Sequence, residues 1–474
     1  MGSSKALDVN PSKSAANNEG ESPCLGSPIV EETKTGTAVR DQDERIGIGP
    51  PPDGGFIAWL QVFGSFFLFF NSWGIMNTFG VFQTYYESAL PHSSPSAISW
   101  IGSLQAFLLR FVGVITGPLY DIGYFRTLIA TGTFLVVFGT MMTSLGTHYW
   151  HFLLAQGFCV GLGAGCVYMP CVSVIPQYFT TKRGLATGVA ATGSSFGGVL
   201  YPIIFRNLER SIGFGWAVRI MAFVSLATCS ISFSLMRLRH HPSLSPTGRP
   251  AISSPSTNVT VTKKQTRSLL EPAAFKEPPY VFFCAAIFLG CISFFIPIFY
   301  IQSYAQSGPS SSHSISPHLA TYLLAILNAS SILGRLGSGV LDRYAGPVNM
   351  LTLTSILTGT LSLCWIAIPP STTGGLVTFA VLYGIFSGGF ISLPAVAITS
   401  LTTDMSRLGT RMGMNSAIGG FGSLCGSPIA GAILNGSGGW IGLKIFAGVT
   451  MLGTGLLMGA TKVAKVGWKP WVKA

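Results

Sequence analysis

Twelve apolar runs of membrane length alternate with short polar breaks from residue 56 onward. A helix needs about 20 apolar residues to cross the hydrocarbon core of a bilayer. The predicted spans are 56–82, 97–119, 127–146, 152–174, 184–205, 214–235, 280–302, 319–341, 348–368, 375–398, 412–434 and 440–460. The pattern therefore predicts an all-α membrane protein with twelve transmembrane helices, six on each side of one long polar insert.

Three polar stretches flank and divide these two sets of spans. Residues 1–52 are rich in Ser, Pro, Glu and Asp without a periodic apolar face, which predicts a disordered tail. Residues 236–279 are rich in Ser, Pro and Thr, which predicts a flexible linker. The predicted organisation is a six-helix bundle over 53–235, the linker, a second six-helix bundle over 280–460 and a basic tail over 461–474.

The two sets of spans also repeat one another. A polar hinge, GPLYDIGYFR at Gly117–Arg126, follows the second span, and GRLGSGVLDRYAG at Gly334–Gly346 has the same place in the second half. Spans five and eleven correspond as well, since each carries a glycine nine residues before a proline. Duplicated bundles that rock about a central site are the basis of alternating access in secondary transporters. The repeat therefore predicts two pseudo-symmetric six-helix bundles.

Composition agrees with a membrane chain. Of the 474 residues, 48% are hydrophobic and 9% are charged, whereas an ordinary soluble domain has roughly 25% charged residues. The 58 glycines suit close helix packing in lipid. The nine cysteines lie mostly inside apolar runs, which favours packing roles over disulfides or metal ligands. Neither a cofactor nor a metal is predicted.

Basic residues are concentrated in the loops that follow even-numbered spans. These loops hold Arg126, Lys182, Arg183, Arg343, Arg407, Arg411 and the bases of the linker, whereas the other loops hold only Arg206 and Arg210. The positive-inside rule then places both termini and the linker in the cytoplasm. This bias accounts for the formal charge of +12, so a nucleic-acid partner is not predicted.

The hinge sequences resemble the loop signature of the major facilitator superfamily, in both of its copies. PPDGGFIAW at Pro51–Trp59 and NSWGIMNTFGVFQTYY at Asn71–Tyr86 resemble the first span of its monocarboxylate porter family, in the fungal branch. YFTTKRGLATGVAATGSSFG at Tyr178–Gly197 is similar to the second signature of that family. The resemblance covers about residues 50–465 and implies a monomeric secondary transporter of small organic solutes, often carboxylates.

Two positions depart from this family. Its carboxylate carriers have a substrate-binding arginine in span eight, matched here by Arg335, and an acid one turn earlier, where this chain has Ser331. A lysine of span one that takes part in proton-linked binding is replaced by Asn77. Proton–lactate symport is therefore not implied. Because the predicted spans also lack a central acid or histidine, we expect weak coupling, uniport or coupling through the acid group of the substrate.

Arg335 and Arg110 are the candidates for binding an anionic organic solute. A charge inside a bilayer costs roughly 2.5–3.5 kcal/mol and needs a compensating role, and a guanidinium binds a carboxylate through two parallel hydrogen bonds. Arg110 lies in span two, the repeat counterpart of span eight, so both could face one cavity. Two alternatives stay open. Arg335 could pair with Asp342 or backbone carbonyls in a gate, and Arg110 could pair with another helix or extend toward an interface.

Other polar residues within the spans are candidates for lining the same path, although interhelical hydrogen bonding is the commoner role for such residues. They are Asn77, Gln105, Gln156, Gln177, Asn328, Ser331 and Asn415.

The hinge residues are candidates for a cytoplasmic gate. Asp121 with Arg126, and Asp342 with Arg343, are predicted to hold the two halves together when the transporter is open to the outside. Gly117 and Arg183 belong to the same candidate gate. The alternative is a solvated surface pair in each half, but the duplication of the hinge favours the gate.

The sequence has no phosphate-binding loop of the form GxxxxGK[ST], so neither ATP-driven pumping nor enzymatic activity is predicted. The predicted function is alternating-access transport of a small organic acid or lipophilic metabolite, preferably export of a fungal secondary metabolite. Two alternatives remain, which are uptake of a monocarboxylate or vitamin-like nutrient and a solute sensor that does not transport. We expect the protein in the plasma membrane.

Overall fold

The computed structural model describes residues 52–239, 270–307, 317–402 and 407–468, which all belong to the unit Pro51–Ala474. Every regular element in these ranges is helical. Within them, twelve helical stretches are long and apolar enough to cross a membrane, so the predicted fold class and span count are confirmed. Nearly all of the predicted disordered tail, residues 240–269 of the predicted linker and residues 469–474 of the basic tail lie outside the described ranges.

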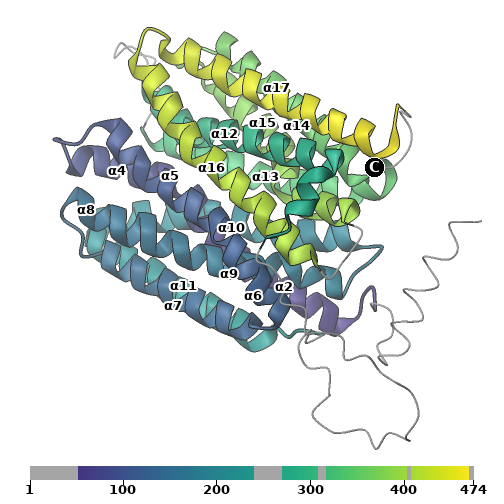
Figure 1. Cartoon of the computed structure of the whole chain (residues 1–474). Helices are drawn as coiled ribbons and strands as arrows, with labels where there is room; N and C mark the ends of the chain where they lie inside the picture. The colour runs from purple at the N-terminus through teal and green to yellow at the C-terminus, as the bar shows by residue number, and fades with distance from the viewer. Residues whose placement is uncertain (1–51, 240–269, 308–316, 403–406, 469–474) are drawn as a thin grey trace, which may run out of the picture. The chain divides into compact units, whose positions relative to one another are not determined.

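The first half contains six spans, some of which are built from consecutive helices (Figure 1). In chain order these helices are α2 (Phe56–Phe69), η1 (Phe70–Gly74), α3 (Ile75–Asn77), α4 (Phe79–Ala89), α5 (Pro95–Phe111), α6 (Gly113–Ile122), α7 (Phe125–Thr143), α8 (Tyr149–Phe152), η2 (Leu153–Val160), α9 (Gly161–Ser173), η3 (Ile175–Gln177), α10 (Arg183–Ile212) and α11 (Phe214–Leu235).

The second half contains the other six spans, preceded by a short 3-10 helix at the end of the linker. Its helices are η4 (Pro272–Lys276), α12 (Pro278–Gln306), α13 (Pro317–Ala345), α14 (Pro347–Cys364), η5 (Trp365–Ala367), α15 (Thr373–Leu401), α16 (Leu408–Asn435) and α17 (Gly439–Val466).

Several spans extend beyond the apolar runs that predict them. The first continues to Ala89, past its predicted end at residue 82. The additional turns are stabilised by Tyr86, whose ring lies 4.3 Å from that of Phe152 and whose hydroxyl donates a hydrogen bond to the Gln156 side chain. A hydropathy pattern gives little weight to such aromatic and polar contacts between helices, so it underestimates the length of the helix.

Spans one and four each contain a π-helical segment, η1 and η2. Segments of this kind are rare and often occur at functional sites, because the wider turn redirects the side chains that follow. The segment η1 is fully buried and carries Trp73.

The two halves pack against each other through corresponding helices. Helix α10 of the first half packs on α13 of the second, while α16 of the second half packs on α5 and α6 of the first, as Figure 1 shows for α16 and α5. Each hinge contains a glycine with positive φ, 106° at Gly123 and 87° at Gly346. A residue without Cβ adopts this backbone at little cost, which explains the glycine at both copies of the hinge.

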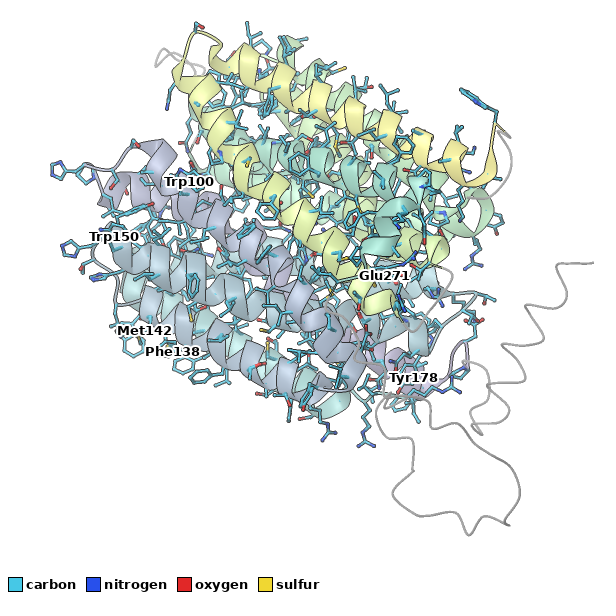
Figure 2. All side chains as sticks on the ribbon, viewed as in Figure 1. Trp100, Phe138, Met142, Trp150, Tyr178 and Glu271 are labelled. Carbon is cyan, nitrogen blue, oxygen red and sulfur yellow. The ribbon has the colours of Figure 1, made fainter. Side chains whose placement is uncertain are left out.

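The two ends of the helices differ in their side chains (Figure 2). Trp100 and Trp150 lie at one end and are exposed, as expected for aromatic residues at a membrane surface. Tyr178 and Glu271 lie at the other end, and Gln177 there donates a hydrogen bond of 3.0 Å to the hydroxyl of the hinge residue Tyr120. We call this second end the hinge end.

Candidate functional site

A cavity between the two halves is lined by residues from both. The first half contributes Trp73, Arg110 and Tyr168, and the second contributes Phe390, Asn415 and Ser416, whereas the remaining lining positions are apolar. The cavity volume is about 30 Å³, well below the ~150 Å³ of a cavity that holds benzene. The halves are therefore nearly closed over the cavity. Among the described residues that line it, Arg110 alone is charged.

The guanidinium of Arg110 lies against the face of Trp73, with its central carbon 4.6 Å from the ring centroid. The side chain is 9% exposed, and its Nε has no hydrogen-bond partner. The cation–π contact compensates part of the cost of burying the charge, but an unpaired buried N–H remains unfavourable. On α16, Gly419 leaves room for the group, since a Cβ there would lie 3.1 Å from Nη1. This arrangement suits an anion that enters the cavity.

The aromatic wall beside Arg110 includes residues that the sequence did not single out. Trp73 contacts Tyr168 edge-on at 5.8 Å between ring centroids, and the ring of Phe295 lies parallel to Trp73 at 6.2 Å. Within an apolar run, the pattern of hydrophobic and polar positions does not mark an aromatic residue as part of a site. The one available signal was that Trp73 belongs to the family-like segment Asn71–Tyr86.

Arg335 does not line this cavity. It is 1% exposed and lies between α13 and α10, where its Nη1 donates hydrogen bonds to the Ala191 carbonyl and the Ser194 hydroxyl. Arg335 therefore connects the two halves directly. This geometry corresponds to the alternative in which the arginine binds backbone carbonyls.

Of the other polar candidates, Asn415 lines the cavity, whereas Ser331, Asn328, Asn77 and Gln105 are buried outside its lining. Ser331 extends the contact between α13 and α10, because its hydroxyl lies 2.6 Å from that of Ser195. Asn328 donates a hydrogen bond to the Leu324 carbonyl of its own helix, at 3.0 Å. Asn77 and Gln105 each have buried amide atoms without a partner, Oδ1 in the first and both Oε1 and Nε2 in the second. Their role in binding remains a prediction.

At the hinge end, each hinge aspartate lies on the first turn of a helix from the opposite half. The carboxylate of Asp121 faces Gly409 at the start of α16, where a Cβ would lie 2.5 Å from Oδ1. The carboxylate of Asp342 faces Gly184 at the start of α10 in the same way. The positive end of a helix dipole stabilises a carboxylate in this position. The two contacts reproduce the duplication of the hinge.

Close backbone crossings accompany both aspartates. A Cβ on Gly117 of α6 would lie 2.6 Å from the Gly409 carbonyl oxygen, and a Cβ on Gly188 of α10 would lie 2.7 Å from the Arg335 carbonyl oxygen. Gly184 and Gly188, like Gly409 and Gly413, are spaced as GxxxG, which lets two helices approach closely. We call these two crossings the glycine crossings.

The basic residues of the candidate gate are exposed or contact other groups. Arg126 is exposed and stacks on the ring of Phe233 at 5.9 Å, and Arg343 is also exposed. Arg183 is half-buried, and its Nε donates a hydrogen bond of 3.3 Å to the Phe179 carbonyl. Their role in gating remains a prediction.

Two acidic anchors at the hinge end were not predicted from the sequence. In the second half, Arg411 of α16 forms ion pairs with Glu271 at 3.1 Å and Glu277 at 2.7 Å, just before α12. In the first half, Asp53, just before α2, accepts hydrogen bonds from the backbone N–H groups of residues 180, 181 and 182 at 2.9–3.3 Å. In each half, the anchor joins the start of the first span to the start of the fifth span.

The pKa of Asp53 reflects this anchor. Burial raises the pKa, but the hydrogen bonds from the Thr181 side chain and the three backbone N–H groups outweigh it and lower the pKa to about 2. Since the folded pKa is below the usual value of 3.8, the anchor stabilises the fold fully above pH about 4. The stabilisation is lost as the pH falls toward 2.

Replacing Asp53 with Asn is expected to lower the midpoint of thermal unfolding at pH 7 by on the order of 2 °C, because the charged acceptor is lost. Asn is the suitable substitute, since residue 53 has a φ of 52°, which Asn tolerates. Unfolding of the purified chain should be followed between pH 7 and pH 3. The difference from the unsubstituted chain should narrow below pH about 4, and a constant difference would contradict the role of the charge.

Two helical halves that share a small cationic cavity, with matching contacts at one end, define a membrane transporter. Comparison with known proteins identifies the family. The profile of the Major Facilitator Superfamily matches residues 56–376 and 281–470. The chain therefore belongs to this superfamily, and it is a multi-pass membrane transporter rather than an enzyme.

Several curated relatives cover nearly the whole chain. "MFS-type transporter dbaD" of Emericella nidulans is 41% identical over 95% of this chain and 94% of its own length. "Aspyridones efflux protein apdF" of the same fungus is 40% identical over 87% of this chain and 79% of its own. "Fujikurins efflux protein" of Gibberella fujikuroi is 37% identical over 86% of this chain and 83% of its own.

A solved structure matches the fold. The transporter FucP in its outward conformation aligns with a TM-score of 0.56 at 16% identity, covering 85% of this chain and 98% of FucP. At this identity the match concerns the fold alone, which agrees with the predicted major facilitator fold.

Proposed function

We propose that this protein exports an anionic fungal secondary metabolite by alternating access. Two relatives are named as efflux proteins for aspyridones and fujikurins, which supports export as the direction. The observation that carries the anionic substrate is Arg110, a buried cation with an unpaired Nε in the cavity between the halves. Within the superfamily, the narrower assignment is to the monocarboxylate porter type, on the sequence resemblance described above.

In this proposal the hinge end forms the cytoplasmic gate. The basic loops support a cytoplasmic hinge end in the plasma membrane, with both termini on that side. Opening toward the cytoplasm separates Asp121 from Gly409 and Asp342 from Gly184, and it breaks the hydrogen bonds of Arg335 to α10. The protein acts as a monomer, because the cavity is completed by the two halves of one chain.

Coupling to protons would depend mainly on the substrate. In the described spans, the acids Glu87, Asp121, Glu209 and Asp342 lie near helix ends, and mid-span positions carry no Asp, Glu or His. A proton carrier near the cavity is thus missing from this part of the chain. The substrate would then move as a free anion or carry its own proton on its acid group.

Accumulation of a labelled probe tests the proposal. Cells that express the full chain and cells that do not should be loaded with radiolabelled 1-naphthoic acid, an apolar carboxylate. If the protein exports the probe, the expressing cells should lose the probe faster and should contain less of it at steady state. The proposal is overturned if the content rises, which would indicate uptake, or if it is unchanged while purified protein binds the probe, which would indicate a sensor.

A further inference from the structure

Four buried polar atoms without hydrogen-bond partners belong to residues that line the central cavity. They are Trp73 Nε1 and Arg110 Nε in the first half, and Asn415 Oδ1 and Ser416 Oγ in the second. The exposed fractions of these residues are 2%, 9%, 7% and 4%. Polar side-chain atoms buried this deeply nearly always have a partner, and leaving one unpaired is unfavourable. Their convergence on one cavity points to a ligand.

The chemistry of the four atoms differs between the halves. Trp73 Nε1–H and Arg110 Nε–H can only donate, so the first half presents donors to an anionic oxygen. Asn415 and Ser416, which are neighbours on α16, offer an amide and a hydroxyl that can both donate and accept. An isolated carboxylate would satisfy the first pair only. A second oxygen on the ligand that carries a hydrogen is needed for the other pair, because Asn415 Oδ1 can only accept.

The rest of the lining describes the body of the ligand. The remaining walls are apolar or aromatic, including Phe390 and Ile391 of α15 and Met412 of α16. A small acid of a few carbons would leave these walls without contacts. A planar conjugated ring would pack against aromatic side chains of the lining such as Tyr168 and Phe390, and methionine adapts to irregular shapes.

We propose that Asn415 and Ser416 are specificity residues that recognise a second oxygen beside the acidic group of a planar hydroxy acid. This inference rests on the proposed function and names the substrate class of the same site. The acidic oxygen binds at Arg110 and Trp73, and the neighbouring hydroxyl group binds at α16, where it can donate to Asn415 Oδ1. Because the two groups of contacts come from opposite halves, a ligand with both oxygens favours a conformation in which both halves close around it, with a cavity larger than the present 30 Å³, more than a ligand with one.

Matched aromatic acids test this assignment. Binding of 2-hydroxy-1-naphthoic acid and of 1-naphthoic acid, which lacks the hydroxyl, should be measured by titration calorimetry on the purified full chain. We expect the hydroxy acid to bind about tenfold more tightly, the effect of one well-placed hydrogen bond. The double variant Asn415→Leu with Ser416→Ala should lose this preference and still bind 1-naphthoic acid.

Ser423→Ala is the matched control, because Ser423 is a buried serine on the same helix whose hydroxyl donates to the Gly419 carbonyl outside the cavity lining. It should keep the tenfold preference. The assignment is overturned if the double variant keeps the preference, if the unsubstituted chain has none, or if it binds neither acid. The proposed function fails separately if Arg110→Gln binds both acids as tightly as the unsubstituted chain does.

Discussion

Replacing Arg110 with Gln is expected to reduce transport of 1-naphthoate by about 100-fold, a larger effect than any other substitution in the cavity. Arg110 carries the one charge among the described lining residues, and it is nearly enclosed between Trp73 and α16. A charged hydrogen bond contributes about 1.5–3 kcal/mol, and 100-fold corresponds to about 2.7 kcal/mol. Initial rates of flux in proteoliposomes, together with the Kd of the probe, give the measurement.

Two further variants separate binding from structure. Arg110→Lys keeps the charge but loses the planar fork and the stacking on Trp73, so an intermediate loss of about tenfold is expected. Arg335→Gln removes the other buried arginine of the repeat, which contacts Ala191 and Ser194 rather than the cavity. It should alter flux while the Kd stays within about twofold. Wild-type flux of the anion by Arg110→Gln would refute the cationic site.

The twelve spans could be predicted because hydropathy is local. Each apolar run is long enough to identify a crossing without knowledge of its neighbours. The repeated hinge is also local, and the positive φ at Gly123 and Gly346 explains why glycine occurs in both copies. The positions of the helix ends were predicted less accurately, since Tyr86 and its contacts with Phe152 and Gln156 extend the first span beyond its apolar run.

The contacts between the halves could not be predicted in detail, because they join residues far apart in the chain. The sequence shows that Asp121 and Asp342 occupy equivalent positions in the two halves. Because each is followed by a base, the sequence suggests a charge pair and does not indicate that each carboxylate faces a glycine of the opposite half. For the same reason, the sequence does not indicate that Trp73 and Tyr168 pack together in one aromatic wall. Arg110 and Arg335 illustrate the limit, since equivalent spans place Arg110 in the cavity and Arg335 against α10.

Adding one methyl group at a glycine crossing is expected to open the hinge end and reduce transport at least tenfold. In Gly117→Ala and in Gly188→Ala, the new Cβ would lie 2.6 and 2.7 Å from a backbone carbonyl oxygen of the opposite half. Overpacking of this kind costs about 1–3 kcal/mol, which shifts the balance of two conformations by roughly 5- to 150-fold. This overpacking destabilises only the conformation with a closed hinge end, because the crossing exists only when the halves meet.

Cys291 provides the measurement, because it lines the cavity and is buried in the closed conformation. In a background where the other cysteines are replaced by Ala, both variants should react with a maleimide about tenfold faster at Cys291. Gly337→Ala is the control, since a Cβ on this α13 glycine would meet nothing within 4 Å. Alanine also favours helix over glycine, so a loss of helix stability cannot account for the result. Equal labelling in all three variants would mean that the glycine crossings do not govern access to the cavity.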